Sequence, residues 1–223
     1  MGAPDGGLWK TTNGGTSYTT NTDQLTVIGC SDVAIDPTNN QIMYLATGDS
    51  DGGDTYSVGV LKSTNGGTTW NTTGLTWTVN QGRTISRILV NPTNPQIVMA
   101  FASNGIWRST NGGTTWAQPT GTFNGIKDAE FKPGDPNTVY AAGTSFRRST
   151  DGGATWTNVN NAGVYSGATT PSLTITGATS TMNEYRYRLQ VSQSNFACGT
   201  IVSNAARLIL SNSVTIINDN IAT

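Results

Sequence analysis

One motif occurs four times in this chain, and its spacing constrains the fold more than any other sequence feature. Each copy runs from apolar and basic residues through Ser or Thr, Asn or Asp and Gly-Gly to a final aromatic residue. The copies align without gaps over 8–18, 60–70, 106–116 and 146–156. The Ser or Thr that opens the motif recurs after 52, 46 and 40 residues, at Thr11, Ser63, Ser109 and Ser149.

A second element recurs between the copies, a Pro-containing turn between two apolar segments, at 32–46, 88–100 and 128–142. Proline lacks the N–H that a strand ladder needs, so it stands where the chain reverses. Asn-Gly or Asp-Gly between β-forming residues is a strong hairpin signal. Each unit is therefore predicted to hold four strands within ~40–50 residues, the size of a propeller blade. A β-solenoid is the alternative architecture, but its repeats are usually shorter.

Composition agrees with an all-β fold and excludes several functions. The chain is rich in Thr, Asn and Gly, which favour strands and tight turns, and its aromatic residues argue against disorder. A net charge of −1 gives no basic surface for nucleic acid, which we do not expect as a partner. No apolar run reaches the ~18–20 residues of a membrane span. Because the chain has 0 His, His-dependent catalysis and His-ligated metal sites are excluded.

The two cysteines, Cys30 and Cys198, are too few for a thiolate-only zinc site. A disulfide between them would suit a secreted protein, but nothing in the sequence places them side by side. Residues 1–5 have neither the basic nor the apolar region of a signal peptide. We therefore expect either a cytoplasmic protein or a processed, cloned or truncated form of an exported one.

The motif Ser-Thr-Asn/Asp-Gly-Gly-Thr-Thr-Trp resembles the Asp-box, or BNR repeat. This repeat occurs in sialidases, xyloglucan-degrading propeller hydrolases, the sortilin ectodomain and a photosystem assembly factor. The resemblance covers residues 7 to about 158. It implies a propeller fold with this turn at the blade periphery and an extracellular or cell-surface location, but little about activity.

In this interpretation the Asn or Asp caps the N–H groups of its own turn, and Gly-Gly supplies positive φ. The terminal Trp is expected to pack between neighbouring blades. These residues are predicted to determine the fold and not to catalyse: Asn13, Gly15, Ser63, Asn65, Gly67, Trp70, Ser109, Asn111, Gly113, Trp116, Ser149, Asp151, Gly153 and Trp156.

The last quarter of the chain does not follow the blade pattern. Its strand-like segments resemble the last three strands of immunoglobulin-like domains of secreted bacterial proteins, with Tyr187 as the tyrosine-corner residue. Leu189 stands where such domains carry a cysteine, so Cys198 is expected to be a lone thiol. We predict propeller blades over 1–158, partial Ig-like strands over 159–211 and a tail over 212–223.

The blade count is about three and a half, because the first repeat supplies only its last two strands. Propellers have at least four blades, and an open arc exposes apolar faces at a cost of ~25 cal/mol per Å². The C-terminal strands could complete a fourth blade, two chains could associate through open propeller edges, or the chain could be a fragment of a larger protein. We favour a fragment or an arc.

Two loops carry the candidate ligand-binding residues. The first holds Asp49, Asp51, Asp54 and Tyr56, and its three carboxylates in a Gly-rich loop could bind Ca²⁺. The loop does not match the full EF-hand pattern, so a solvated acidic loop without a cofactor is the preferred interpretation.

The second loop places Trp77 beside Gln81 and Arg83. An aromatic ring with hydrogen-bonding neighbours suits a sugar ring or a peptide. Packing of Trp77 in the core between blades is an equal alternative.

Hydrolysis of a glycoside would need two carboxylates ~5–5.5 Å or ~6.5–9.5 Å apart. Asp49 and Asp54 form the only compact candidate pair, and two acids on one loop rarely lie on both sides of a substrate. The arginine triad and the Tyr/Glu pair of the sialidases are not recognisable. The sequence therefore predicts a non-catalytic binding or adhesion module for a carbohydrate or protein ligand. A fragment of a xyloglucanase- or sialidase-like glycoside hydrolase is the alternative.

Overall fold

The computed structural model describes residues 2–3, 6–50, 55–159, 165–166, 174–187, 190–191, 201–202 and 206–210. The chain divides into two compact units, Met1–Val159 and Asn160–Thr223. Their described residues form short antiparallel strands, and the helical segments are two 3-10 turns, η1 (Val79–Gln81) and η2 (Ser180–Met182). The predicted all-β class is confirmed. No helix within these ranges is long and apolar enough to cross a membrane.

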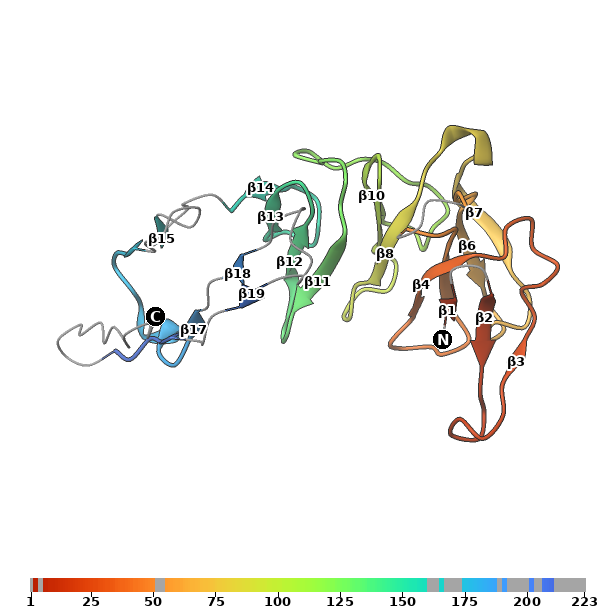
Figure 1. Ribbon diagram of the computed structural model, residues 1–223, viewed down its shortest axis with the longest axis horizontal. Helices are drawn as coiled ribbons and strands as arrows, with labels where there is room; N and C mark the ends of the chain where they lie inside the picture. Colours follow the sequence, from red (N-terminus) through yellow and green to blue (C-terminus); the bar gives the residue numbers. More distant parts are fainter. Residues whose placement is uncertain are drawn as a thin grey trace. The chain divides into compact units, whose positions relative to one another are not determined.

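Four antiparallel sheets follow one another along the first unit (Figure 1). The first contains β1 (Gly2–Ala3), β2 (Gly7–Lys10) and β3 (Thr19–Thr20). The second contains β4 (Cys30–Ile35), β5 (Met43–Thr47), β6 (Gly59–Ser63) and β7 (Asn71–Thr76). The third contains β8 (Ile85–Val90), β9 (Val98–Ala102) and β10 (Gly105–Ser109). The fourth contains β11 (Asp128–Lys132), β12 (Asp135–Ala142), β13 (Phe146–Ser149) and β14 (Thr157–Asn158).

In the third sheet a bridge between Arg108 and Ala117 stands where the fourth strand would lie. The unit therefore consists of a partial first sheet and three blades, which is the predicted arc of propeller blades.

Four turns close the last hairpin of each sheet, and we call them the box turns (residues 11–18, 63–70, 109–116 and 149–156). In the third, the buried Ser109 hydroxyl accepts a hydrogen bond from the Gly113 N–H at 2.9 Å and donates to Asn111 Oδ1 at 3.0 Å. The same Oδ1 accepts from the Thr115 N–H at 2.9 Å. Gly112 and Gly113 have φ of +62° and +89°, a region that favours glycine. Side-chain oxygens thus satisfy backbone groups that the tight turn leaves without a strand partner.

Asp151 performs this role in the fourth box turn, where its Oδ1 accepts from the Thr155 N–H at 2.9 Å. Asn13 and Asn65 do the same in the first two turns, with Ser17 and Thr69 as donors. The position needs a side-chain oxygen acceptor and not a negative charge, which explains why Asn occupies it in three box turns and Asp in the fourth.

Three hydrophobic clusters fill the spaces between consecutive sheets. The tryptophan at the end of the second, third and fourth box turns packs against the preceding sheet. Trp156 shows this most clearly, because it is 4% exposed and meets Phe101 edge-on, with ring centroids 5.9 Å apart. Trp70 packs against the cluster between the first and second sheets, and Trp116 packs against the cluster between the second and third. The blades are therefore joined mainly by apolar burial.

The described part of the second unit contains three two-stranded sheets. Their strands are β15 (Tyr165–Ser166), β16 (Thr174–Ile175), β17 (Arg186–Tyr187), β18 (Gln190–Val191), β19 (Ile201–Val202) and β20 (Ala206–Arg207). β15 pairs antiparallel with β16, β17 with β20 and β18 with β19. The Ig-like interpretation stays a prediction. Leu189 and Cys198 lie outside the described residues.

Among the described residues Cys30 is a free, buried thiol, with 2% of its surface exposed. Burial, and secondarily the nearby Asp32 carboxylate, raises the pKa of Cys30 to about 12. The thiolate is the reactive species, so this thiol is inert while the protein is folded.

We expect Ser109→Ala to lower the free energy of unfolding by about 1–3 kcal/mol, because the Gly113 N–H loses its acceptor in a buried turn. Urea unfolding of the two proteins measures the difference. Thr110→Ala is the matched control, since Thr110 is exposed and adjacent, and it should leave the midpoint unchanged. Equal midpoints for the two variants would contradict the role assigned to Ser109.

A second prediction concerns Cys30 in a Cys198→Ser background, where it is the only thiol. At pH 8 a group with a pKa of about 12 is a thiolate in roughly one molecule in 10⁴. Ellman's reagent should therefore react slowly with the native protein and rapidly in concentrated urea. Equal rates in the two conditions would show that the thiol is accessible.

Candidate ligand-binding site

The functional candidates that the structure describes lie at one end of the blades, which we call the loop end (48–50, 55–58, 77–84, 103–104 and 118–127). Cys30 pairs with Thr47 and Gly59 with Thr76, so the β5–β6 and β7–β8 connections lie at the same end of the second blade. The box turns and the Pro-containing turns lie at the opposite end. Loops on a rigid scaffold commonly carry binding residues, so a ligand-binding site is expected at the loop end.

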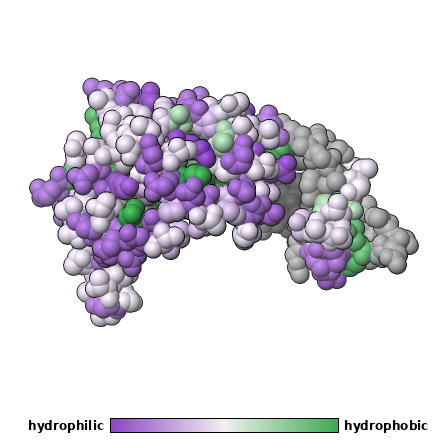
Figure 2. Space-filling model, turned by 180° about the vertical axis from the view of Figure 1, so that it is seen from behind, coloured by the Kyte–Doolittle hydropathy of each residue, from purple (hydrophilic) through white to green (hydrophobic). Residues whose placement is uncertain are grey.

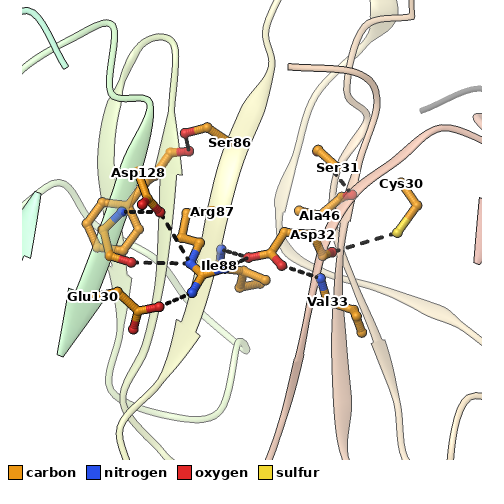
Figure 3. Close-up of polar contacts among 12 residues, drawn as sticks. Cys30, Ser31, Asp32, Val33, Ala46, Ser86, Arg87, Ile88, Asp128 and Glu130 are labelled. Atoms are coloured by element: carbon orange, nitrogen blue, oxygen red, sulfur yellow. Dashed lines mark hydrogen bonds and ion pairs between the residues drawn. The ribbon is translucent and has the colours of Figure 1, made fainter. Parts of the chain in front are cut away.

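Charged side chains from the first strands of three blades meet near the loop end (Figure 3). Arg87 on β8 lies between Asp32 on β4 and the pair Asp128 and Glu130 on β11. Arg87 Nη1 is 3.7 Å from Asp32 Oδ2, and Arg87 Nε is 3.6 Å from Asp128 Oδ1. Arg87 Nη2 binds Glu130 Oε1. We call these four residues the acid–guanidinium cluster.

Asp32 is the most buried acid of the cluster, with 17% of its side chain exposed. Its two oxygens accept hydrogen bonds from the Val33 and Ile88 N–H groups, both at 2.9 Å. Burial raises the pKa of Asp32, whereas the Ile88 N–H and the Arg87 charge act in the opposite direction. Asp32 thus links two neighbouring blades through both a backbone bond and an ion pair.

Asp128 and Glu130 differ from Asp32 because they are open to solvent, with 68% and 62% of their side chains exposed. The Arg87 guanidinium also donates to the Ala129 carbonyl at 3.2 Å, which fixes its plane between the strands. The cluster therefore offers exposed carboxyl oxygens as acceptors beside a positioned cation. In Figure 3 the guanidinium separates Asp32 from the two β11 acids, so these acids do not face each other across an open space.

Sequence reasoning did not find this cluster, although the repeats hold a signal for it. Asp32, Arg87 and Asp128 each stand five residues before a proline, namely Pro37, Pro92 and Pro133. When the three repeats are aligned on these prolines, one blade position holds an acid, then a base, then an acid.

Of the acidic loop, the structure describes Asp49 and Tyr56, whereas Asp51 and Asp54 lie outside the described residues. Asp49 is 4% exposed, and its N–H donates to the Thr55 carbonyl at 2.7 Å. Tyr56 is 41% exposed at the loop end. Within the described ranges no three His, Cys, Asp or Glu residues come together as a metal site. The calcium site and the ligand role of this loop stay predictions.

The second predicted loop brings Trp77 and Arg83 together. The Arg83 guanidinium lies 5.3 Å from the centre of the Trp77 ring, and Trp107 meets that ring edge-on at 6.4 Å. Trp77 is 9% exposed and belongs to the hydrophobic core, so the cation covers a ring that is already packed. Gln81 Oε1 accepts from the Thr78 N–H at 2.9 Å and closes η1. The binding role of these residues stays a prediction.

No protein-family model and no curated protein matches the sequence. Solved structures do match. An ancestral GH74 enzyme is 22% identical with a TM-score of 0.58, and the match covers 74% of this chain and 23% of that one. The GH74 enzyme of Niastella koreensis is 27% identical with a TM-score of 0.51, and the match covers 73% of this chain and 28% of that one. The GH74 xyloglucanase of Xanthomonas campestris is 20% identical with a TM-score of 0.55, and the match covers 74% of this chain and 29% of that one. The chain thus spans less than a third of each neighbour, and the likeness supports a propeller fold.

The cluster predicts a pH-dependent effect of Arg87→Met. The pKa of Asp32 is raised in the folded protein, so ionisation of Asp32 lowers the free energy of unfolding as the pH rises above the unfolded value of 3.8. The positive charge of Arg87 offsets part of this loss. Removal of the cation should therefore lower the free energy of unfolding by about 1–3 kcal/mol at pH 7, and by less at pH 3. Urea unfolding at the two pH values measures this. Lys127→Met, which removes an exposed cation, should show no such difference.

Proposed function

We propose that this chain is part of a non-catalytic, secreted or cell-surface carbohydrate-binding protein, and that the glycan binds at the loop end on the acid–guanidinium cluster. The observation that carries the proposal is the position of Arg87 between Asp32 and the exposed pair Asp128 and Glu130. Arg87 is a shared partner that holds the three acids in place. It makes them suited to accepting hydrogen bonds.

Sugar hydroxyls both donate and accept hydrogen bonds, and those to ionised groups are about twice as strong as neutral ones. Asp128 and Glu130 would accept from hydroxyls, while the outer N–H groups of Arg87 would donate to them. Tyr56, exposed at the same end of its blade, supplies an aromatic face of the kind on which sugar rings pack.

Carbohydrate is preferred to protein as the ligand for two reasons. The solved structures that match include GH74 enzymes, one of them a xyloglucanase. On the face shown in Figure 2, polar residues predominate and hydrophobic ones form small separate spots. Protein interfaces usually have a continuous buried core with few charged residues, whereas the acid–guanidinium cluster consists of four charged side chains.

A fragment of a glycoside hydrolase is the second candidate, because the matching structures are GH74 enzymes. Retaining and inverting mechanisms need two carboxylates ~5–5.5 Å or ~6.5–9.5 Å apart, with the substrate between them. In the acid–guanidinium cluster a cation occupies that space. Asp49 together with Asp54 remains the acid pair for this alternative.

The same proposal assigns the remaining parts of the chain. The box turns would be Asp-boxes, residues 1–158 propeller blades, 159–211 partial Ig-like strands and 212–223 a tail. An extracellular location follows from the resemblance to Asp-box proteins.

Calorimetric titration with xyloglucan and cello-oligosaccharides tests the binding proposal. The double variant Asp128→Asn/Glu130→Gln should bind at least about tenfold more weakly, which corresponds to the loss of 1.4 kcal/mol or more. Glu184→Gln is the matched control, because Glu184 is also an exposed acid paired with an arginine, Arg207, but belongs to the second unit. It should bind as the wild type does.

The same samples distinguish the two candidates. Release of reducing ends from xyloglucan that disappears in Asp49→Ala would favour the hydrolase. Absence of any glycan binding by the wild-type chain, with folding verified by circular dichroism, would contradict the binding proposal.

A further inference from the structure

A groove of about 230 Å³ lies between the third and fourth blades, and we call it the inter-blade groove. Its walls come from the third box turn, the segment that follows that turn and one residue of the fourth box turn. The volume is below the ~300–1,000 Å³ of sites for drug-sized ligands, so it suits a ligand of about one sugar unit. The lining residues that matter for its chemistry are Arg108, Trp116, Gln118, Pro119 and Ala154.

Arg108 is the charged residue of the groove, and one of its nitrogens is already fixed. Arg108 Nε donates to the Gly152 carbonyl of the fourth box turn at 2.9 Å. Lys62 makes the same contact one blade earlier, from Nζ to the Gly112 carbonyl at 2.8 Å. We call these bonds forward contacts. Within the described residues, Arg108 Nη1 and Nη2 form no hydrogen bond or ion pair, so both remain free to donate.

The free end of Arg108 fits a carboxylate. Two terminal nitrogens in one plane match the two oxygens of a carboxylate, and such bidentate bonds are among the strongest in proteins. Burial lowers the pKa of Arg108, whereas the Asp151 charge acts in the opposite direction. Asp151 itself accepts hydrogen bonds from Ser149 and Thr155 inside its own turn. The partner for the guanidinium end would therefore come from a ligand.

The groups beside this guanidinium suit a sugar ring. Trp116 is half-buried, and its indole N–H donates to the Gly113 carbonyl at 3.0 Å, which fixes the plane of the ring. Pro119 adds a second rigid apolar surface. Gln118 Nε2 donates to the Asn104 carbonyl at 2.8 Å, so the side-chain amide is positioned and its Oε1 can accept from a hydroxyl.

The sequence departs from its own repeat at Ala154, on the far wall of the groove. The other three box turns have threonine at this position, and each hydroxyl donates to the carbonyl of the Asn of the same turn. These threonines are Thr16, Thr68 and Thr114. The fourth turn gives up that bond and leaves the space of a methyl and a hydroxyl group open. Departures from a local rule without a local gain are typical of functional sites.

Pro119 is a second departure, on the near wall. The corresponding residue of the second blade is Thr73, inside the outermost strand β7. Proline cannot donate to a strand ladder, and the chain leaves the third sheet here. The Thr120 carbonyl then accepts from the Trp156 N–H of the fourth box turn at 2.9 Å. The segment thus crosses to the next blade and closes one side of the groove.

We propose that the inter-blade groove binds a uronic acid residue of a polysaccharide. Its carboxylate accepts from Nη1 and Nη2 of Arg108, its ring packs on Trp116 and a hydroxyl donates to Gln118 Oε1. A neutral sugar lacks the carboxylate, and a simple anion lacks the ring. This site shares no residue with the acid–guanidinium cluster, so the proposal stands or falls independently of glycan binding at the loop end.

Methyl β-glucuronide and methyl β-glucoside test the proposal, because the two share a pyranose ring and differ in one carboxylate. Proton–nitrogen NMR of the full chain follows the Trp116 indole N–H. The glucuronide should shift this signal with a dissociation constant of about 1 mM, the order expected for so small a ligand. The glucoside should bind at least tenfold more weakly. Equal binding of the two, no shift with the glucuronide, or equally tight binding of acetate would overturn the proposal.

Two substitutions keep the fold and change the groove. Arg108→Lys retains a forward contact of the kind that Lys62 makes but removes both terminal nitrogens. Ala154→Thr restores the residue of the other three box turns and places it in the groove. Each should weaken glucuronide binding at least tenfold. Arg148→Lys is the matched control, since it makes the same change at the corresponding position of the fourth blade, and it should bind as the wild type does.

The Trp156 indole signal reports folding in the same spectra, because Trp156 is buried between the third and fourth blades. A variant that keeps this signal and binds the glucuronide as tightly as the wild type does would contradict the role given to Arg108 or to Ala154. Equal weakening by Arg148→Lys would show that the carboxylate is not read in the inter-blade groove.

Discussion

The buried hydroxyl group of the box turn is the constraint on which the rest of the first unit depends. At Ser109 it accepts a backbone N–H and donates to the side chain that binds the end of the turn. These bonds let Gly112 and Gly113 adopt positive φ and aim the Gly112 carbonyl at the preceding blade. They also hold the following tryptophan against that blade. One hydroxyl thus couples the closure of a hairpin to the packing of two sheets.

The acid–guanidinium cluster and the box turns satisfy different physical requirements at opposite ends of the blades. The polar groups of a box turn form hydrogen bonds within the turn, so few of them are available to a ligand. The cluster instead joins side chains from three strands and leaves Asp128 and Glu130 open to solvent. Burial raises the pKa of the partly buried Asp32, and two N–H groups and Arg87 offset part of the lost hydration of its carboxylate. Function at the loop end is compatible with this division.

The strands and turns were predictable because the interactions that form them are local. Pro37 and Pro92 stand at chain reversals, and Gly-Gly follows an Asn or Asp that can reach its own turn. The cluster was not predicted, since it depends on which strands become neighbours, and Arg87 alone is an ordinary charged residue. The sequence also left undecided whether Trp77 packs in the core or contacts a ligand, because its burial depends on Trp107 in the next blade.

Lys10, Lys62 and Arg108 each donate to the carbonyl of the first glycine of the next box turn, and these forward contacts affect how the chain tolerates change. Each one joins a strand residue to a turn at the same level of the next blade, so its geometry does not depend on the chain that runs between them. The spacing between motifs shortens from 52 to 40 residues while the donor-to-carbonyl distance stays between 2.7 and 2.9 Å. Lengthening or replacing the connections at the loop end should therefore leave the framework intact. The arc is in this respect a scaffold whose binding surface can be exchanged segment by segment.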